Sequence, residues 1–332
     1  MKILYAAPEK AWGGFLDLIR AELPEHHFEA TGRFGVDRLK GYDVLIPTMC
    51  LITAEMLEDS DRLRLIQQCG SGLEGVDLAA ARRHDIRVAN VPTDISGNAD
   101  SVAELGIFLM IGLCRDLRGM AKSLANRKMG EPRGKSLCGC TVGVVGLGGI
   151  GRALIKRLKP FDVHLIGIKR NNPGAAMEEL GLEWVGGADE LKVLLRKSDF
   201  VVLCLPVTAE SSNLMNPETF ACVRSGAFLI NLSRGGLVDP DALLNVLASG
   251  QIAGAGLDVF WEEPPDPDHS IFHYNVLATP HIAGSTDVSM RGIVKVVAEN
   301  IRRVEKNMRP LYCKFLKILQ FQYFSVSLRS RN

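Results

Sequence analysis

Short apolar runs alternate with amphipathic stretches through the first 90 residues of the chain. We expect strands where apolar residues are continuous, and helices where they recur every three or four positions. The predicted strands are residues 3–6, 44–46, 63–67 and 86–89, and the predicted helices are residues 15–23, 54–57 and 78–83. This alternation predicts a parallel sheet with helices on both faces.

The pattern changes after Pro92. Residues 99–117 are apolar almost all round, which predicts a long buried helix that crosses between two domains or forms a dimer face. The alternation resumes at Thr141, with strands predicted at 142–145, 163–168, 200–205, 227–232, 253–259 and 276–278 and helices at 150–158 and 285–304. Continuous apolar strands of this kind are typical of sheets covered on both faces. The predicted fold class is therefore α/β, with two doubly wound parallel-sheet domains.

The composition excludes several classes of protein. The 332 residues are enough for two domains, and their formal net charge of +1 is spread along the chain without a basic cluster. No apolar run is long enough to span a membrane, and the first strand begins too close to Met1 to leave room for a signal peptide. We therefore predict a cytoplasmic protein with no nucleic-acid partner and no membrane partner.

The cysteines do not form a recognisable ligand set. Cys138 and Cys140 are the closest pair among the eight, and no histidine lies near them in the sequence. Metal sites and disulfide frameworks both need regular spacings that are missing here. We predict reduced thiols and no bound metal.

A glycine motif follows the first strand of the second half. In the sequence TVGVVGLGGIG, Gly146, Gly148 and Gly151 have the spacing G-x-G-x-x-G between a strand and a helix. These glycines permit a tight turn, a close approach of a pyrophosphate and close packing of helix on strand. The helix N-terminus favours a negative charge. The motif predicts a dinucleotide site, although a plain strand-to-helix turn would also contain glycines.

The residue that normally selects the cofactor is changed. About 20 residues after such a motif, an acidic residue at the end of the next strand binds the ribose 2′-hydroxyl of NAD. Lys169 and Arg170 occupy that strand end instead. Two cations suit a 2′-phosphate, so we predict NADP as the preferred cofactor over NAD. If the pair is only a solvated strand end, both cofactors would bind.

Three further strand ends carry reactive side chains. Arg234 follows the strand 227–232, Glu262 and Glu263 follow the strand 253–259, and His281 follows the strand 276–278. Ligands of open α/β sheets bind at the carboxyl ends of the strands. A histidine beside a nicotinamide could protonate a carbonyl oxygen, a glutamate could orient it, and an arginine could hold a carboxylate. Each residue alone could equally be a surface charge or a strand cap.

These motifs resemble those of the D-isomer-specific 2-hydroxyacid dehydrogenases. The resemblance extends to about Pro310 and rests on GLGGIG, CLPVTAESSNLMN, NLSRGGLVDPDAL, AGLDVFWEEPP and TPHIAGST in the family's order. It implies that Arg234, Glu263 and His281 are the catalytic residues, because the family's glutamate directly precedes the proline. The implied reaction is reduction of a small 2-oxo acid, of the glyoxylate or hydroxypyruvate type, to the D-2-hydroxy acid, or the reverse.

The resemblance also implies a division into domains. A flavodoxin-like, discontinuous substrate domain would comprise residues 1–98 and 286–332, and a Rossmann domain that binds NAD(P) would comprise residues 99–285. A homodimer through residues 99–135 is implied as well, although the arm 126–135 lacks a tryptophan that the family often has there. The tail from residue 312 departs from the family's ending, and we assign it no function.

The same resemblance completes the predicted site. The predicted cofactor-binding residues are Gly146, Gly148, Gly149, Ile150, Gly151, Lys169, Arg170, Leu205, Pro206, Ser233, Asp258 and Gly284. The predicted substrate-binding residues are Ser71, Gly72, Leu73, Asn98 and Arg234. Asp258 is expected at the nicotinamide amide, and backbone N–H groups of the glycine loop 70–73 at the substrate carboxylate. Leu73 and Trp261 are expected to bound the substrate side chain.

Two other kinds of protein share this pattern. Some relatives with this fold bind NAD(H) as transcriptional corepressors and keep the three catalytic residues, and a catalytically inactive binding protein is a further alternative. Formate-oxidising members pair the histidine with glutamine, so Glu263 argues against that branch. The three intact residues favour an enzyme.

Overall fold

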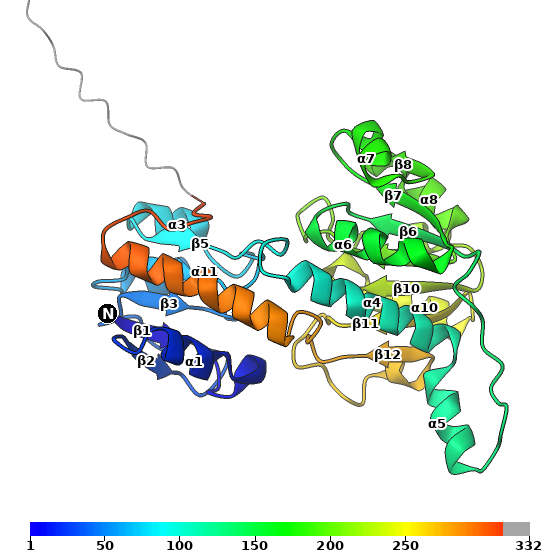
Figure 1. Ribbon diagram of the computed structural model, residues 1–332, viewed down its shortest axis with the longest axis horizontal. Coiled ribbons are helices and arrows are strands. Elements are labelled where there is room, and N and C mark those ends of the chain that lie inside the picture. The colour runs from blue at the N-terminus through cyan, green and yellow to red at the C-terminus, as the bar shows by residue number, and fades with distance from the viewer. Residues whose placement is uncertain (315–332) are drawn as a thin grey trace, which may run out of the picture.

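The structure is a computed structural model that describes residues 1–314. Within this part of the chain the backbone forms two separate sheets, each flanked by helices (Figure 1), and the strands of each sheet are all parallel. The predicted α/β class with two parallel-sheet domains is confirmed. Most of the tail that we set apart, residues 315–332, lies outside the described residues.

The first sheet has the strand order β2-β1-β3-β4-β5. Its strands are β1 (Lys2–Tyr5), β2 (His27–Ala30), β3 (Val44–Ile46), β4 (Leu65–Gln67) and β5 (Arg87–Ala89), and the helices between them are α1 (Ala11–Glu22), α2 (Ala54–Glu58) and α3 (Leu78–Arg83). This is the doubly wound order of flavodoxin-like folds, in which the order reverses between β1 and β3.

The second sheet has seven strands in the order β12-β11-β10-β9-β6-β7-β8. Its strands are β6 (Thr141–Val145), β7 (His164–Ile168), β8 (Trp184–Gly186), β9 (Phe200–Leu203), β10 (Ala227–Asn231), β11 (Ile252–Leu257) and β12 (Val276–Ala278). The helices that connect them are α6 (Gly149–Leu158), α7 (Pro173–Leu180), α8 (Leu191–Lys197), α9 (Pro217–Phe220) and α10 (Pro240–Ala248). The first six strands in chain order have the Rossmann arrangement, with the switch point between β6 and β9.

Local sequence explains most of these elements. Every residue of β10 is buried, which agrees with its uninterrupted apolar run. Side chains cap some of the helix starts: the Thr53 hydroxyl accepts from the N–H of Met56 at 3.4 Å, and the Asp239 carboxylate accepts from the N–H of Ala242 at 2.9 Å. Such caps satisfy N–H groups that have no partner within the helix.

The predicted helix 99–117 is wrong at its C-terminal end. The structure has two helices here, α4 (Asn98–Cys114) and α5 (Leu117–Ala125). Asp116 separates them because it adopts a left-handed backbone conformation, and its carboxylate accepts from the N–H of Gly119 at 2.9 Å. An aspartate N-cap after an apolar run therefore started a new helix.

Two strands and several helices were not predicted. β2 and β8 are edge strands of four and three residues, of which one and two residues respectively are buried. Their sequences lack the apolar continuity of the central strands, so pairing with a neighbouring strand decides their structure. The sequence pattern likewise predicts none of the helices α7 to α10.

Two long helices connect the domains. α4 packs with the core of the second sheet, whereas α11 (Asp287–Glu305) returns across the molecule to the first sheet (Figure 1). Their N-terminal turns meet through a 2.7 Å hydrogen bond between the hydroxyls of Ser101 and Thr286. A side chain on Gly292 would lie 2.2 Å from the carbonyl oxygen of Ser96, so this crossing needs a glycine.

The far end of α11 docks on the first sheet through a buried polar contact. Asn300 is fully buried, and its Nδ2 donates to Oε1 of Gln67 at 2.7 Å while its Oδ1 accepts from the N–H of Leu311 at 2.6 Å. The predicted limits of the domains, at residues 98/99 and 285/286, stay a prediction. No helix within residues 1–314 has the length and apolar character needed to cross a membrane.

Candidate active site

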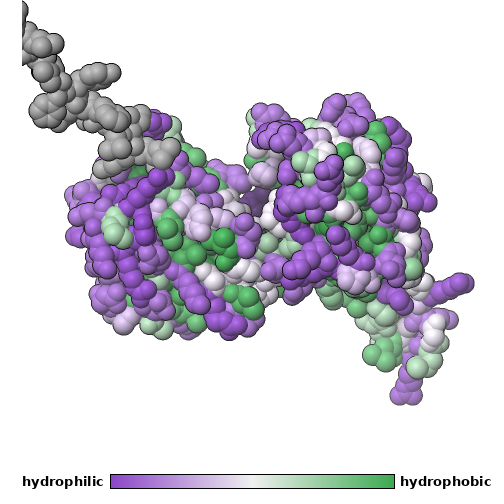
Figure 2. All heavy atoms as spheres, turned by 45° about the horizontal axis from the view of Figure 1, so that its top comes forward, coloured by the Kyte–Doolittle hydropathy of each residue, from purple (hydrophilic) through white to green (hydrophobic). Residues whose placement is uncertain are grey.

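A cavity of about 610 Å³ lies where the two domains meet, at a waist of the molecule (Figure 2). It is lined from the first domain by residues such as Trp12, Met49 and Ser71, and from the second by Arg234, Glu263 and His281. The three predicted catalytic residues thus line one cavity although they come from three different strand ends. Parallel strands bring such side chains together because their carboxyl ends share one edge.

His281 and Glu263 form the central polar pair of this cavity. Nδ1 of His281 lies 2.7 Å from Oε2 of Glu263, and both side chains are mostly buried. The second carboxylate oxygen of Glu263 accepts from the N–H of Phe260 at 3.0 Å. Glu263 is therefore held at both oxygens, and it orients the imidazole through one nitrogen while Nε2 is left without a partner among the described residues.

The charge state of Glu263 is set by opposing effects. Burial acts to raise the pKa of its carboxyl group. The hydrogen bond and charge of His281, the N–H of Phe260 and the charge of Arg234 outweigh burial, so the pKa is lowered. Glu263 is consequently an anion at neutral pH.

Arg234 lies just after the end of β10 and lines the cavity. Its backbone oxygen accepts from Nδ2 of Asn231 at 2.8 Å, and its guanidinium lies 3.8 Å from the carboxylate of Glu74 in the first domain. A side chain on Gly235 would lie 2.0 Å from the carbonyl oxygen of Phe260. The loops after β10 and β11 therefore approach each other closely only because Gly235 has no side chain.

Asp258 organises the loop that carries His281. It is buried, and it accepts hydrogen bonds from the hydroxyl of Thr279 at 2.7 Å and from the N–H groups of Ile282 at 2.9 Å and Ala283 at 3.0 Å. Burial raises the pKa of its carboxyl group, and these hydrogen bonds offset the rise only in part. Asp258 also lines the cavity. Its expected contact with a nicotinamide amide stays a prediction.

The glycine loop has room for a pyrophosphate. A side chain on Gly148 would meet nothing within 4 Å, whereas one on Gly151 would lie 2.1 Å from the carbonyl oxygen of Gly146, and Gly146 itself has a left-handed φ of 101°. The first-turn N–H groups of Gly149, Ile150 and Gly151 donate to no acceptor within residues 1–314. Free donors at a helix N-terminus suit an anion, so these residues fit the phosphates of a dinucleotide.

The remaining predicted cofactor residues surround this loop. β7 ends at Ile168, so Lys169 and Arg170 lie at the carboxyl end of a strand that pairs with β6. Neither of these two side chains has an ion-pair or hydrogen-bond partner in the described part of the chain. Leu205 and Pro206 follow β9, and Leu205 approaches Gly146 closely. Ser233 is buried, and its hydroxyl donates to the carbonyl oxygen of Leu203 at 3.0 Å.

The predicted substrate loop approaches Arg234 across the domain boundary. A side chain on Gly72 would lie 2.1 Å from Nη2 of Arg234, and Ser71 and Gly72 both line the cavity. Leu73 does not line it, because its side chain packs against the core of the first domain. Trp261 does line the cavity, and its indole N–H donates to the carbonyl oxygen of Val238 at 2.5 Å.

Asn98, a predicted substrate-binding residue, lies where the two domains cross, and its role toward a substrate stays a prediction. It is the first residue of α4, it lines the cavity, and its Nδ2 donates to the hydroxyl of Ser289 on α11 at 3.2 Å. Gly284 lies against it, since a side chain there would come within 2.1 Å of Nδ2. Asn98 and Gly284 therefore join the cavity wall to the interdomain crossing.

Comparison with known proteins identifies the family. The family model described as D-isomer specific 2-hydroxyacid dehydrogenase, NAD binding domain, matches residues 107–283. A glyoxylate reductase from Thermococcus litoralis is 32% identical over 288 residues, which cover 83% of this chain and 84% of the relative. The chain belongs to the D-isomer-specific 2-hydroxyacid dehydrogenase family. The predicted family resemblance is thereby confirmed, with a domain that binds NAD.

Two further comparisons define the extent of this similarity. A D-3-phosphoglycerate dehydrogenase from Methanocaldococcus jannaschii is 34% identical over 272 residues, which cover 81% of this chain but only 51% of the relative. The chain thus spans about half the length of such relatives. A crystal structure of a protein from Thermus thermophilus superposes with a TM-score of 0.80 at 30% identity, covering 95% of this chain and all of that one.

Several residues of this dehydrogenase site were not predicted from the sequence. Trp12 lines the cavity from the turn after β1, and Glu74 faces Arg234. Asn90 holds the substrate loop, because its Nδ2 donates to the carbonyl oxygen of Ser71 at 2.7 Å. Asn90 and Glu74 lie next to predicted elements and could have been suspected, but nothing in the sequence separates Trp12 from an ordinary core residue.

Groups of three or more histidine, cysteine, aspartate or glutamate side chains that could hold a metal ion do not occur within residues 1–314. The charged and polar groups of the cavity described above include a histidine, three carboxylates, an arginine and backbone N–H groups.

We expect the stabilisation that Glu263 provides to depend on pH. Because its pKa is lowered in the folded protein, the stabilisation is complete above the ordinary pKa of an unfolded glutamate, about 4.3, and is lost as the pH falls through the lower folded value. Urea unfolding of the wild type and of Glu263→Gln should differ by about 1–3 kcal/mol near pH 6, with the difference shrinking toward pH 3.

The neighbouring exposed Glu262 provides the control for this measurement. Glu262→Gln should change the free energy of unfolding little at any pH between 3 and 6. A Glu263→Gln difference that stays constant down to pH 3 would contradict the assigned ion pair with His281.

Proposed function

We propose that the chain reduces a small 2-oxo acid, of the glyoxylate or hydroxypyruvate type, to the D-2-hydroxy acid with NAD(P)H, or catalyses the reverse reaction. The observation that carries this proposal is the His281–Glu263 pair, 2.7 Å apart, in the same interdomain cavity as Arg234. An oriented acid and a carboxylate-binding cation are the groups that carbonyl reduction requires from a protein.

The proposed roles follow from the contacts. The reduced nicotinamide, when bound, supplies a hydride to the carbonyl carbon. The electron pair of the C=O π bond moves to oxygen, and His281 delivers a proton from Nε2 to that oxygen as charge develops. Glu263 holds Nδ1 and stabilises the imidazolium. Arg234 holds the substrate carboxylate, with the backbone of the loop at Ser71 and Gly72 facing it.

The charges of the cavity support a substrate with one carboxylate. Among the described lining residues only Arg234 and His281 have cationic side chains, whereas Glu74, Asp258 and Glu263 are acidic. A phosphate group on the substrate would need a further cation, because burying an unpaired charge is costly. The similarity to a glyoxylate reductase supports the same choice.

We propose NADP as the preferred cofactor and NAD as the alternative. Lys169 and Arg170 are exposed or half-buried and have no ion-pair partner among residues 1–314, which leaves both charges available to a 2′-phosphate. Arg170 lies near Glu210 of the loop after β9, where it adds to the Thr208 hydroxyl and a backbone N–H in lowering the pKa of that carboxyl. This loop and the end of β7 lie next to the position where we expect the ribose 2′-phosphate.

The first test of the activity follows oxidation of NADPH and NADH with glyoxylate, hydroxypyruvate, 3-phosphohydroxypyruvate and phenylpyruvate. We expect turnover with the unphosphorylated small acids, and a loss of about 100-fold or more in His281→Gln. Cofactor binding without any turnover would favour a sensor or corepressor-like protein. A His281→Gln variant that reduces the 2-oxo acids as fast as the wild type would contradict the role of His281.

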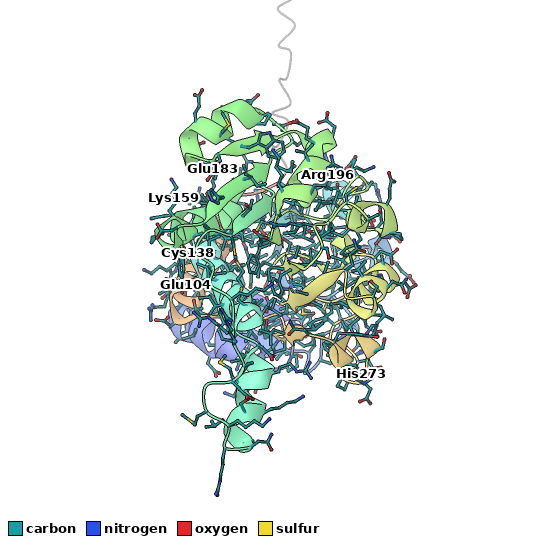
Figure 3. All side chains as sticks on the ribbon, turned by 90° about the vertical axis from the view of Figure 1, so that its right-hand side faces the viewer. Glu104, Cys138, Lys159, Glu183, Arg196 and His273 are labelled. Carbon is teal, nitrogen blue, oxygen red and sulfur yellow. The ribbon has the colours of Figure 1, made fainter. Side chains whose placement is uncertain are left out.

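Lys169→Asp tests the cofactor proposal. Replacing a charge-assisted contact by repulsion should lower kcat/KM for NADPH relative to NADH by about 10- to 100-fold, since such contacts contribute about 1.5–3 kcal/mol. The control is Lys197→Asp in α8, whose side chain does not line the cavity; the preceding residue, Arg196, is labelled in Figure 3. An unchanged cofactor ratio in Lys169→Asp would overturn the proposed role of this cation.

We also propose a homodimer through residues 99–135. No residue of α5 is buried, although Leu117, Met120 and Leu124 are apolar, and the segment extends away from the second domain (Figure 1, Figure 2). Leu124 is 77% exposed, and Met129 of the following loop is 90% exposed. Large exposed apolar side chains gathered on a projecting segment are typical of a protein interface.

Leu124→Glu should convert the dimer to a monomer or weaken its association by about 100-fold, because it places a charge in an apolar interface. Light scattering after size-exclusion chromatography measures the mass. Leu18→Glu in α1, at a position that is 42% exposed, is the matched control and should leave the mass unchanged. A wild type that is monomeric at all concentrations would contradict the proposal.

A further inference from the structure

One aromatic contact crosses from the first domain to the candidate proton donor. The ring of Trp12 meets the imidazole of His281 edge-on, with centroids 5.8 Å apart and planes inclined at 84°. Trp12 belongs to α1 of the first domain, whereas His281 and its partner Glu263 follow strands of the second. The imidazole is thus held by a hydrogen bond from its own domain and by a ring contact from the other.

The backbone at Trp12 has an unusual conformation that places the ring beside His281. Trp12, Gly13 and Gly14 all have left-handed conformations, with φ values of 54°, 62° and 83°. A tryptophan in this region costs about 1–2 kcal/mol, which surrounding contacts must offset. One such contact is Phe34, whose ring packs against Trp12 with centroids 6.2 Å apart. The next residue in the helix, Phe15, is buried in the core and anchors the turn.

The contact depends on the ring of Trp12 and not on its N–H group. The indole nitrogen is buried, and it has no hydrogen-bond partner in the described part of the chain. A phenylalanine at this position would keep an aromatic face and edge while losing no hydrogen bond. Phe is therefore a conservative replacement here, which is unusual for a buried tryptophan.

The ring contact supplies a restraint that Glu263 cannot supply alone. A single hydrogen bond at Nδ1 fixes one atom of the imidazole, but the ring can still turn about the line that joins Nδ1 to Oε2 of Glu263. Nε2 lies across the ring from Nδ1, so such a turn changes the direction of the proton that it carries. A packed aromatic ring beside the imidazole limits this rotation through steric contact.

We propose that Trp12 is a positioning residue for His281, and that it fixes the imidazole plane when the two domains are together. The proposal rests on the proposed function, because it assigns Trp12 to the proton-delivery step of that reaction. Since the contact spans both domains, the acid is fully oriented only in the closed arrangement. Proton delivery therefore depends on the first domain covering the substrate.

Steady-state kinetics of Trp12→Ala and Trp12→Phe test the proposal. Trp12→Ala should lower kcat for 2-oxo acid reduction by about 10- to 100-fold, as expected for a misplaced catalytic group. KM for the 2-oxo acid should change less than threefold, because Arg234 remains in place. Trp12→Phe should restore most of kcat. The control is Trp184→Ala, which removes a ring that contacts Lys197 away from the cavity and should leave kcat unchanged.

A solvent isotope effect separates this role from a purely structural one. If proton delivery becomes slow, kcat of Trp12→Ala should fall further in D₂O than kcat of the wild type does. A variant that is merely less folded would show a lower kcat with the wild-type isotope effect. An unchanged kcat, or a lower kcat without rescue by Phe and without a larger isotope effect, would overturn the proposal.

Tryptophan fluorescence tests the contact without any substrate. An imidazole packed against an indole quenches its emission, so the emission of Trp12, taken as wild type minus Trp12→Phe, should be weaker than the same difference measured in a His281→Gln background. A difference between the two backgrounds in a protein that turns over no 2-oxo acid would refute the proposed function alone. Equal signals in the two backgrounds would refute the contact.

Discussion

Every functional side chain described here depends on one constraint, the meeting of two parallel sheets at their carboxyl edges. A parallel strand delivers its last residue to the same edge as its neighbours, so Arg234, Glu263 and His281 reach one cavity from the ends of three consecutive strands. The first sheet delivers Ser71 and Gly72 to the opposite wall by the same rule. The crossing of α4 and α11 brings these two edges face to face. At this crossing Gly292 of α11 lies against the backbone of Ser96.

Two carboxylates five residues apart acquire different properties from their surroundings. Asp258 is buried among neutral donors, and the pKa of its carboxyl group is raised, whereas the pKa of Glu263 is lowered by His281. Asp258 uses both oxygens to hold the loop from Thr279 to Ala283, and Glu263 orients the imidazole that this loop presents. Asp258 thus holds the backbone of the loop in place, whereas Glu263 carries the negative charge beside the imidazole. The different surroundings of the two carboxylates decide these different roles.

Two contacts between the domains involve residues that line the cavity. Gly72 lies against the guanidinium of Arg234, and the ring of Trp12 lies against His281. Both contacts join a residue of the first domain to a residue that the second domain already positions by hydrogen bonds. The guanidinium of Arg234 and the imidazole of His281 therefore both have surroundings that depend on the distance between the domains. Closure of a cleft in enzymes commonly serves to exclude water and to assemble catalytic groups in this way.

The sequence by itself determined the class of fold, the positions of the central strands along the chain, the glycine loop and the three polar residues at strand ends, because continuous apolar runs and local turn chemistry depend on near neighbours. It did not determine the edge strands β2 and β8, whose few apolar residues leave pairing to a neighbouring strand, or the break at Asp116. Nor did it separate Leu73, which packs in a core, from Ser71, which lines the cavity. Trp12 shows the limit most clearly, since its partner His281 is far away in the chain. Only the tertiary structure brings such residues together, because contacts between domains depend on how two independently formed sheets pack and not on any local pattern.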